Sequence, residues 1–186
     1  MPRQRGSAAL GIFISNIKSM EQVSINKNAH LSPHFTLGEM CKTSVKTADG
    51  NIPSHVHIEN LKRVCVWLEA LRCRYNEQYV CGAVSPPTQE GKAAPIIINS
   101  GYRSPELNKL VGGVPTSNHL TGCAVDIRVT GIEQAKRYRD ILIEYANETK
   151  QDYDELLIER NKSGNYWLHF AVRPKGNRRK TKIINK

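Results

Sequence analysis

The chain has 186 residues, of which 39% are hydrophobic and 24% charged, and its formal net charge is +10. This composition is ordinary for a globular protein, and the length suffices for one domain with a hydrophobic core. The sequence has no run of 18 or more apolar residues, which excludes a transmembrane helix and predicts that the protein does not insert into a membrane.

The N-terminal segment, MPRQRGSAALGIFISNIKSM, joins basic residues to a short apolar run. That order is typical of a signal peptide, but the SNIKSM that follows the run is polar and offers no small-x-small cleavage site. We therefore expect residues 1–29 to be a disordered extension, with Met20 as an alternative start. We also expect a protein made in the cytoplasm rather than exported through this segment.

The first half of the body predicts two helices and one buried strand. A capped segment leads into a short helix near residues 37–41, and Gly and Pro in residues 42–56 indicate a loop. The stretch IENLKRVCVWLEALRCRY has apolar side chains at helical spacing, which predicts an amphipathic helix over residues 58–75. After a loop rich in glycine and proline, IIIN at residues 96–99 predicts a short buried strand.

The second half predicts two more helices and three more strands. Ser104 and Pro105 are typical of a helix start, so we expect a helix through SPELNKLV. CAVDIRV predicts a strand, and Thr130 with Glu133 predicts a capping box that opens a helix to about Glu148. ELLIE and YWLHFAV predict two further strands. Neighbouring strands joined by short loops indicate an α+β fold, with a largely antiparallel sheet backed by helices.

Positive charge is concentrated at the two ends of the chain. Residues 1–29 carry four basic side chains and one acidic side chain, and residues 173–186 carry seven basic side chains and no acidic one. The body between them is net neutral, so residues 176–186 are expected to be a basic tail that suits polyanions. A polyanion-associated or nucleic-acid-associated basic protein is one alternative function. Nucleic acid is not the expected partner, because no DNA-binding or RNA-binding motif accompanies the tail.

The five cysteines indicate a reducing compartment, because their number is odd and no CxxC pair occurs. Cys123 lies near the candidate site described next. Its position in the predicted strand directs the thiol toward the core, so we expect a structural role for it.

The segment TSNHLTGCAVDI suggests half of a metal site, with His119 and Asp126 seven residues apart. Gly122 and the β-rich CAVDIRV disfavour one continuous helix. A loop bearing His119, followed by a strand, would place Asp126 on the face opposite the apolar residues of that strand. The same alternation in YWLHFAV places His169 opposite an apolar set. Two histidines and one carboxylate are the ligands of a catalytic zinc, with a fourth position left for water.

The chain contains three short motifs: SGYRS at residues 100–104, SNHLTGCAVDI from Ser117, and WLH ending at His169, with the pattern SxHxxGxAxD complete. Together these segments resemble the zinc D-Ala-D-Ala carboxypeptidase family of peptidoglycan peptidases. The similarity runs from about Leu31 to Arg179. It implies the fold shared by lysostaphin-type enzymes and the hedgehog signalling domain, in a zinc peptidase domain at residues 30–175. It also implies one zinc ion per chain, with the ligands His119, Asp126 and His169.

The same resemblance implies roles for further residues. Arg103 matches the arginine that polarises the scissile carbonyl and stabilises the oxyanion, Ser117 matches a serine near the substrate, and Trp167 would form a wall of the cleft. Several members hold the catalytic base three residues before the last histidine, where this chain has Tyr166. YDELLIE resembles instead a strand that ends in the site glutamate, which selects Glu159.

Strand parity does not decide the choice of base, because Leu157 would share a face with Glu159. Asp154 and Glu155 come earlier in the segment, and we expect them to be surface charges.

The expected function is therefore a zinc-dependent metallopeptidase that hydrolyses peptide bonds in peptidoglycan stem peptides. Carboxypeptidase and endopeptidase action are both compatible with the sequence. By resemblance, the protein would be a phage or prophage endolysin-like monomer that reaches the cell wall through a separate pore, with its basic tail on anionic wall polymers. The alternative within the same fold is a zinc-binding module without catalytic activity.

Overall fold

The computed structural model describes residues 26–81 and 93–185. Most of the expected extension, residues 1–25, lies outside this range. The described chain begins with a small antiparallel sheet of β1 (His30–Ser32) and β2 (Phe35–Thr36), followed by the short helix α1 (Leu37–Met40). Among the described residues, no helix has the length and apolar character needed to cross a membrane.

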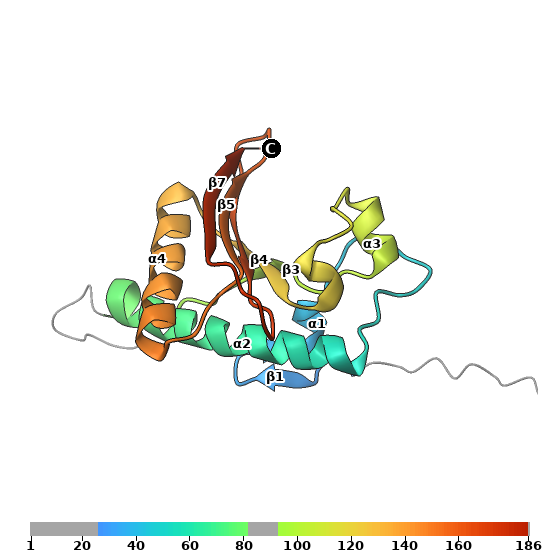
Figure 1. Cartoon of the computed structure of the whole chain (residues 1–186), viewed down its shortest axis with the longest axis horizontal. Helices are drawn as coiled ribbons and strands as arrows, with labels where there is room; N and C mark the ends of the chain where they lie inside the picture. Colours follow the sequence, from blue (N-terminus) through green and yellow to red (C-terminus); the bar gives the residue numbers. More distant parts are fainter. Residues whose placement is uncertain (1–25, 82–92, 186) are drawn as a thin grey trace, which may run out of the picture.

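Within the described residues, a five-stranded sheet forms the centre of the fold (Figure 1). Its strands are β3 (Ile98–Ser100), β4 (Ala124–Arg128), β5 (Glu155–Arg160), β6 (Tyr166–Ala171) and β7 (Lys180–Asn185). They lie in the order β3-β4-β6-β5-β7, and the pairs are antiparallel except for the parallel pair β5 and β7. The predicted α+β fold with a largely antiparallel sheet is confirmed.

One face of the sheet is covered by two long helices, α2 (His55–Tyr75) and α4 (Ile132–Thr149). In Figure 1, α4 stands beside the sheet, while α3 (Pro105–Leu110) lies on the other side of it. The core fills the space between the sheet and the two long helices. Trp67 of α2 packs there against Phe170 of β6, with ring centroids 5.4 Å apart. The opposite face of the sheet is thereby left for polar side chains.

Two helix starts differ from the predicted ones. Helix α2 begins three residues early because Ser54 caps it: the Ser54 hydroxyl accepts from the His57 amide, and the His57 ring accepts from the Ser54 amide. The capping box predicted for Thr130 is wrong, because the residue at the cap of α4 is Gly131, which has no side chain. Thr130 instead donates its amide to the side-chain oxygen of Gln134.

Two one-turn elements complete the described chain. The π-helical turn Asn76–Cys81 extends α2 at its C-terminal end. The 3₁₀ turn Asn118–Thr121 lies between α3 and β4.

The segment expected to be a basic tail is a strand of the central sheet. Lys180 and the residues after it pair in parallel with β5, and Glu155 is the register partner of Lys180. The Lys180 amide also donates to the carbonyl of Asp154 at 3.0 Å. Lysine side chains are common on edge strands, so the charge that indicated a tail is compatible with a place at the sheet edge.

Candidate metal centre

A cleft of about 690 Å³ lies on the side of the sheet away from α2 and α4. The cleft brings together every site residue that the sequence predicts, and these residues come from β4, β5, β6 and the loops beside them. They are Arg103, Ser117, His119, Asp126, Glu159, Trp167 and His169. Residues that are up to 66 positions apart in the chain therefore share one surface.

His119 is held by the turn that carries it. The Ser117 hydroxyl caps this 3₁₀ turn and accepts from the His119 amide at 3.3 Å. Gly122 ends the turn with a φ of +70°, where a Cβ atom would lie 2.6 Å from the backbone oxygen of His57. The turn thus requires glycine at this position. Nδ1 of His119 donates to the carbonyl of Gly101 at 2.6 Å, which leaves Nε2 directed toward Asp126.

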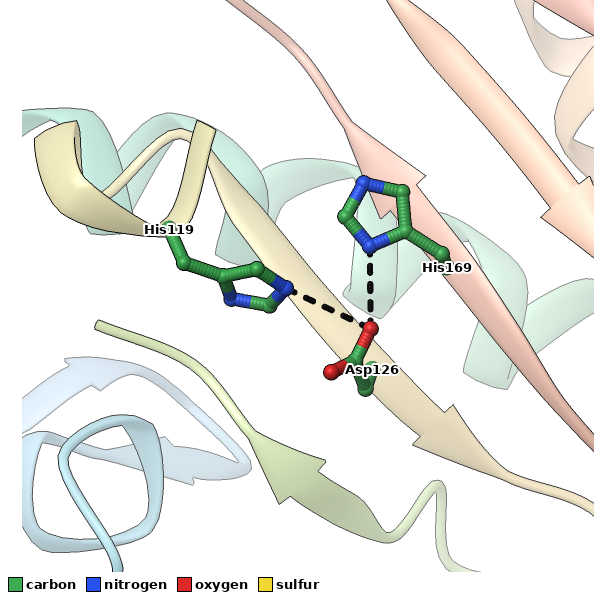
Figure 2. A group of neighbouring side chains, drawn as sticks. All are labelled: His119, Asp126 and His169. Carbon is green, nitrogen blue, oxygen red and sulfur yellow. Dashed lines mark hydrogen bonds and ion pairs between the residues drawn. The ribbon is translucent and has the colours of Figure 1, made fainter. Parts of the chain in front are cut away.

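Asp126 and His169 come from adjacent strands. They are register partners in the antiparallel pair of β4 and β6, and both point into the cleft while Val125 and Ile127 belong to the core. The parity predicted for these strands is confirmed. Figure 2 shows both histidine rings directed at the same oxygen, Oδ1 of Asp126, which is 2.9 Å from Nδ1 of His169 and 3.3 Å from Nε2 of His119.

This donor set fits zinc. Two imidazole nitrogens and one carboxylate oxygen are ligands that zinc prefers, and the three atoms lie within 4.8 Å of one another. His119, Asp126 and His169 expose only 2%, 9% and 8% of their surface, so a bound ion would be largely shielded from solvent. The hydrogen bond from Nδ1 of His119 to a backbone carbonyl selects the tautomer that leaves Nε2 unprotonated.

The pKa values of two candidate ligands favour the forms that bind metal. Burial lowers the pKa of His119, which favours the neutral imidazole. Burial would raise the pKa of Asp126, but its contacts with His119 and His169 outweigh burial and hold that pKa well below its usual range. Metal ligands must be deprotonated, and both groups meet this condition near neutral pH.

Arg103 reaches the cleft from the segment SGYRS. Its guanidinium donates to Oδ2 of Asp126, and its Nε donates to the Ser100 hydroxyl at 2.8 Å. Gly101 allows this segment to pack closely, because a Cβ there would lie 2.3 Å from the backbone oxygen of Met40. Arg103 therefore orients the carboxylate of a candidate ligand in addition to facing the cleft.

Strand β5 places Glu159 in the cleft. Glu155, Leu157 and Glu159 alternate along the face that lines the cleft, whereas Leu156 and Ile158 are in the core. Glu159 is 5% exposed and is the register partner of Trp167, which also lines the cleft. Leu157 is thus a cleft residue, which resolves the parity question left open by the sequence.

The expectation that Asp154 and Glu155 are surface charges is wrong. Asp154 is fully buried, and its carboxylate accepts hydrogen bonds from Asn118, Arg173 and Arg178. Glu155 lines the cleft. The reason is the basic segment that precedes and begins β7, because it folds back over the start of β5 and covers both carboxylates.

Glu155 is the site residue that the sequence analysis missed. Its Oε2 lies 3.6 Å from Nε2 of His169, and its Oε1 accepts from Lys180 at 2.9 Å. The contact with His169 and the hydrogen bond from Lys180 hold the pKa of Glu155 far below its usual value, although burial opposes them. The sequence signal for Glu155 is that it lies four residues before Glu159, an even spacing that puts both carboxylates on one face of the strand.

His169 responds to the same contacts. Burial would lower its pKa, but the hydrogen bond with Asp126 and the contact with Glu155 raise that pKa to about 9.

Cys123, which directly precedes β4, is buried, and burial raises the pKa of its thiol. A buried thiol with a raised pKa is unreactive, in agreement with the structural role expected for it.

Comparison with known proteins supports the metal centre. Residues 88–155 match a family model described as Peptidase M15. The matched segment contains Arg103, His119 and Asp126 and ends before Glu159 and His169. This match supports the zinc D-Ala-D-Ala carboxypeptidase family, and with it a metallopeptidase activity that depends on zinc. A search of curated proteins gives no match.

Proposed function

We propose that the protein is a zinc-dependent metallopeptidase that cuts peptide bonds in peptidoglycan stem peptides, as a carboxypeptidase or an endopeptidase. The observation that carries the proposal is the cluster of His119, Asp126 and His169 in a cleft that also holds an arginine and two glutamates. The match of residues 88–155 to Peptidase M15 supports the same activity. A structural zinc site has four protein ligands, whereas three ligands in an open cleft are typical of a catalytic one.

The residues around the cluster supply the other groups that peptide hydrolysis requires. A zinc ion held by these three ligands would polarise the scissile carbonyl and lower the pKa of a water molecule. Glu159 faces the same cleft and would accept the proton of the attacking water and deliver it to the leaving amine.

Arg103 would stabilise the negative charge that develops on the carbonyl oxygen. A guanidinium has five N–H donors, and the contacts with Asp126 and Ser100 use two of them. The remaining donors allow Arg103 to orient Asp126 and bind the substrate oxygen together. Ser117 and Trp167 also line the cleft and would contact the peptide.

For the cellular setting, we propose a phage or prophage endolysin-like enzyme that acts as a monomer. It would be made in the cytoplasm and reach the wall through a separate pore. The resemblance of SGYRS, SNHLTGCAVDI and WLH to the peptidoglycan peptidases supports this setting.

The test is digestion of purified peptidoglycan with the zinc-loaded protein, followed by mass analysis of the released fragments. Loss of a single terminal residue would identify a carboxypeptidase, and shortened or separated stem peptides would identify an endopeptidase. A chelator and the His119→Ala variant should each abolish release. If the protein binds one zinc per chain but releases no fragment from any stem-peptide type, the proposal is wrong and the protein is a zinc-binding module without catalytic activity.

A further inference from the structure

We propose that Glu155 is a positioning residue that holds the His169 ring in place for the metal, and that Lys180 and Arg178 hold Glu155 in turn. This inference rests on the proposed zinc site. It gives the C-terminal basic segment a role inside the site, in addition to any role in binding anionic polymers.

The two ring nitrogens of His169 face different partners. Nδ1 contacts Asp126 within the metal cluster, whereas Nε2 points away from the cluster, as Figure 2 shows. Nε2 lies 3.6 Å from Oε2 of Glu155. This distance is about 0.6 Å beyond the usual length of an N–H···O hydrogen bond, and a hydrogen bond would form here once a metal on Nδ1 fixes the proton on Nε2. Histidines that bind metal through one nitrogen almost always donate the other N–H to a carboxylate, a carbonyl or water, which fixes the tautomer and the ring plane.

The Glu155 carboxylate is oriented by contacts on both of its oxygens. Oε1 is 2.9 Å from Nζ of Lys180 and 3.1 Å from a guanidinium nitrogen of Arg178. Oε2 accepts from the side-chain amide of Asn118 at 3.1 Å. Because the two cations bind Oε1, Oε2 is the oxygen left on the side of His169.

Asn118 joins this carboxylate to the second histidine. It directly precedes His119, and its side-chain amide donates to both Glu155 and Asp154. The turn that carries His119 is therefore hydrogen-bonded to Glu155 at the start of β5, and Glu155 is also the residue that contacts His169. The arrangement links the elements that carry two of the three candidate ligands.

The surroundings make these contacts strong. The Glu155 side chain is only 13% exposed, so its charge is less screened by water than that of a surface carboxylate. Lys180 is the register partner of Glu155, so the backbone pairing of β5 with β7 brings the ammonium group to the carboxylate. The pairing of β5 with β7 therefore determines where the Lys180 side chain lies.

The test measures zinc affinity by competition with a chelator, which does not depend on peptidase activity. Glu155→Ala should weaken zinc binding by about 10-fold to 100-fold, the usual effect of removing a group that supports a ligand. Glu155→Gln keeps a side-chain oxygen that accepts a hydrogen bond, and should retain most of the affinity. Lys180→Met should cause a smaller loss than Glu155→Ala, because Arg178 still contacts Oε1. In the zinc-loaded protein, the downfield proton resonance of the His169 Nε2–H should be present in wild type and Glu155→Gln and absent in Glu155→Ala.

Asp152→Asn is the matched control, because Asp152 pairs with Arg179 of the same basic segment but does not line the cleft. Its zinc affinity should equal that of wild type. Zinc affinity of folded Glu155→Ala within threefold of wild type would overturn the inference while leaving the zinc site intact. An equal loss in Glu155→Gln and Glu155→Ala would also overturn it, because a hydrogen bond to His169 would then not be the cause. If wild type itself binds no zinc, the proposed function fails together with this inference.

Discussion

His169 and Asp126 are direct cross-strand partners, and Nδ1 of His169 lies 2.9 Å from Oδ1 of Asp126. The side chains of such partners lie close together on one face of the sheet. His119 reaches the same oxygen from a turn that is not part of the sheet. Two of the candidate ligands are thus positioned by strand register, and the third by a capped turn.

The first prediction concerns metal content. The purified protein should hold one zinc per chain, and His119→Ala or His169→Ala should abolish retention, because each leaves two protein ligands for an ion that requires at least three. Elemental analysis after dialysis measures the ratio of zinc to protein. His55→Ala is the control, because the His55 side chain is 87% exposed at the start of α2. Full zinc occupancy in either ligand variant would exclude the site.

The second prediction concerns Arg103. Arg103→Ala should lower turnover by about 10²-fold to 10³-fold, the range for loss of one donor to a developing oxyanion. It should also weaken zinc binding, because Arg103 holds Oδ2 of Asp126. Arg103→Lys keeps the charge but not the planar fork, so it should recover little turnover. Steady-state kinetics and chelator competition separate the two effects, and wild-type turnover in Arg103→Ala would remove Arg103 from the mechanism.

The third prediction concerns the base. Glu159→Gln should keep zinc and fold but lower turnover by roughly 10²-fold to 10⁴-fold, because an amide cannot accept the proton of the attacking water. Glu133→Gln, at an exposed position of α4, should have wild-type turnover. Loss of zinc from Glu159→Gln would mean that the residue supports the ligands. Near-normal hydrolysis would exclude Glu159 as the base and leave Glu155 to be tested.

The fourth prediction concerns the buried carboxylate of Asp154. Asp154→Asn should lower the free energy of unfolding by about 1–3 kcal/mol at pH 7, because the hydrogen bonds from Arg173 and Arg178 lose their charged acceptor. Chemical denaturation followed by circular dichroism measures the difference. A loss below 0.5 kcal/mol, on the order of an ordinary surface substitution, would contradict the structural role.

The stability difference between Asp154→Asn and wild type should also depend on pH. Burial raises the pKa of Asp154, but the hydrogen bonds from Arg178 and Asn118 outweigh it, so the folded-state pKa lies below the usual 3.8. A carboxyl group with a lower pKa in the folded state contributes its full stability above the unfolded-state value and loses it as pH falls through the folded-state value. The difference between the two proteins should therefore be constant from pH 7 to about pH 5 and shrink toward pH 3.

The fifth prediction concerns the charge of the C-terminal segment. Replacing the exposed Lys175 and Lys182 together by glutamine should weaken binding to anionic wall polymers, and the loss should fade as salt rises because exposed charges are screened. Hydrolysis of a small peptide should be unchanged, since neither residue lines the cleft. Cosedimentation with wall material at two salt concentrations measures the binding. Equal binding by the variant and wild type would remove these lysines from polymer recognition.

Deleting residues 176–186 is a different experiment. The deletion removes β7 together with the contacts of Arg178 and Lys180 to Asp154 and Glu155. It should reduce stability and zinc affinity as well as polymer binding. Small-peptide hydrolysis that survives the deletion unchanged would show that β7 is dispensable for the site.

The sequence by itself determined the features that depend on local periodicity. Apolar residues alternate in CAVDIRV and YWLHFAV, and this alternation was sufficient to direct Asp126 and His169 away from the core. The apolar spacing in residues 58–75 likewise identified the helix that covers the sheet. These predictions succeed because the burial of one face of an element leaves a pattern within that element.

Only the tertiary structure decided which elements meet. Strand β7 has the sequence KTKIIN, which shows no regular alternation of apolar residues, and its lysines predicted a basic tail. In the structure this segment instead pairs in parallel with β5 and becomes a strand of the sheet. Glu155 and Lys180 are 25 residues apart, and nothing near either one in the sequence shows that they form an ion pair. Asp154 and Glu155 carry charges that are typical of a surface, yet they are covered because the cations that contact them come from the segment between β6 and β7 and from the start of β7. Such pairs depend on strand order and register, which are set by the packing of the whole sheet and leave no local pattern in the chain.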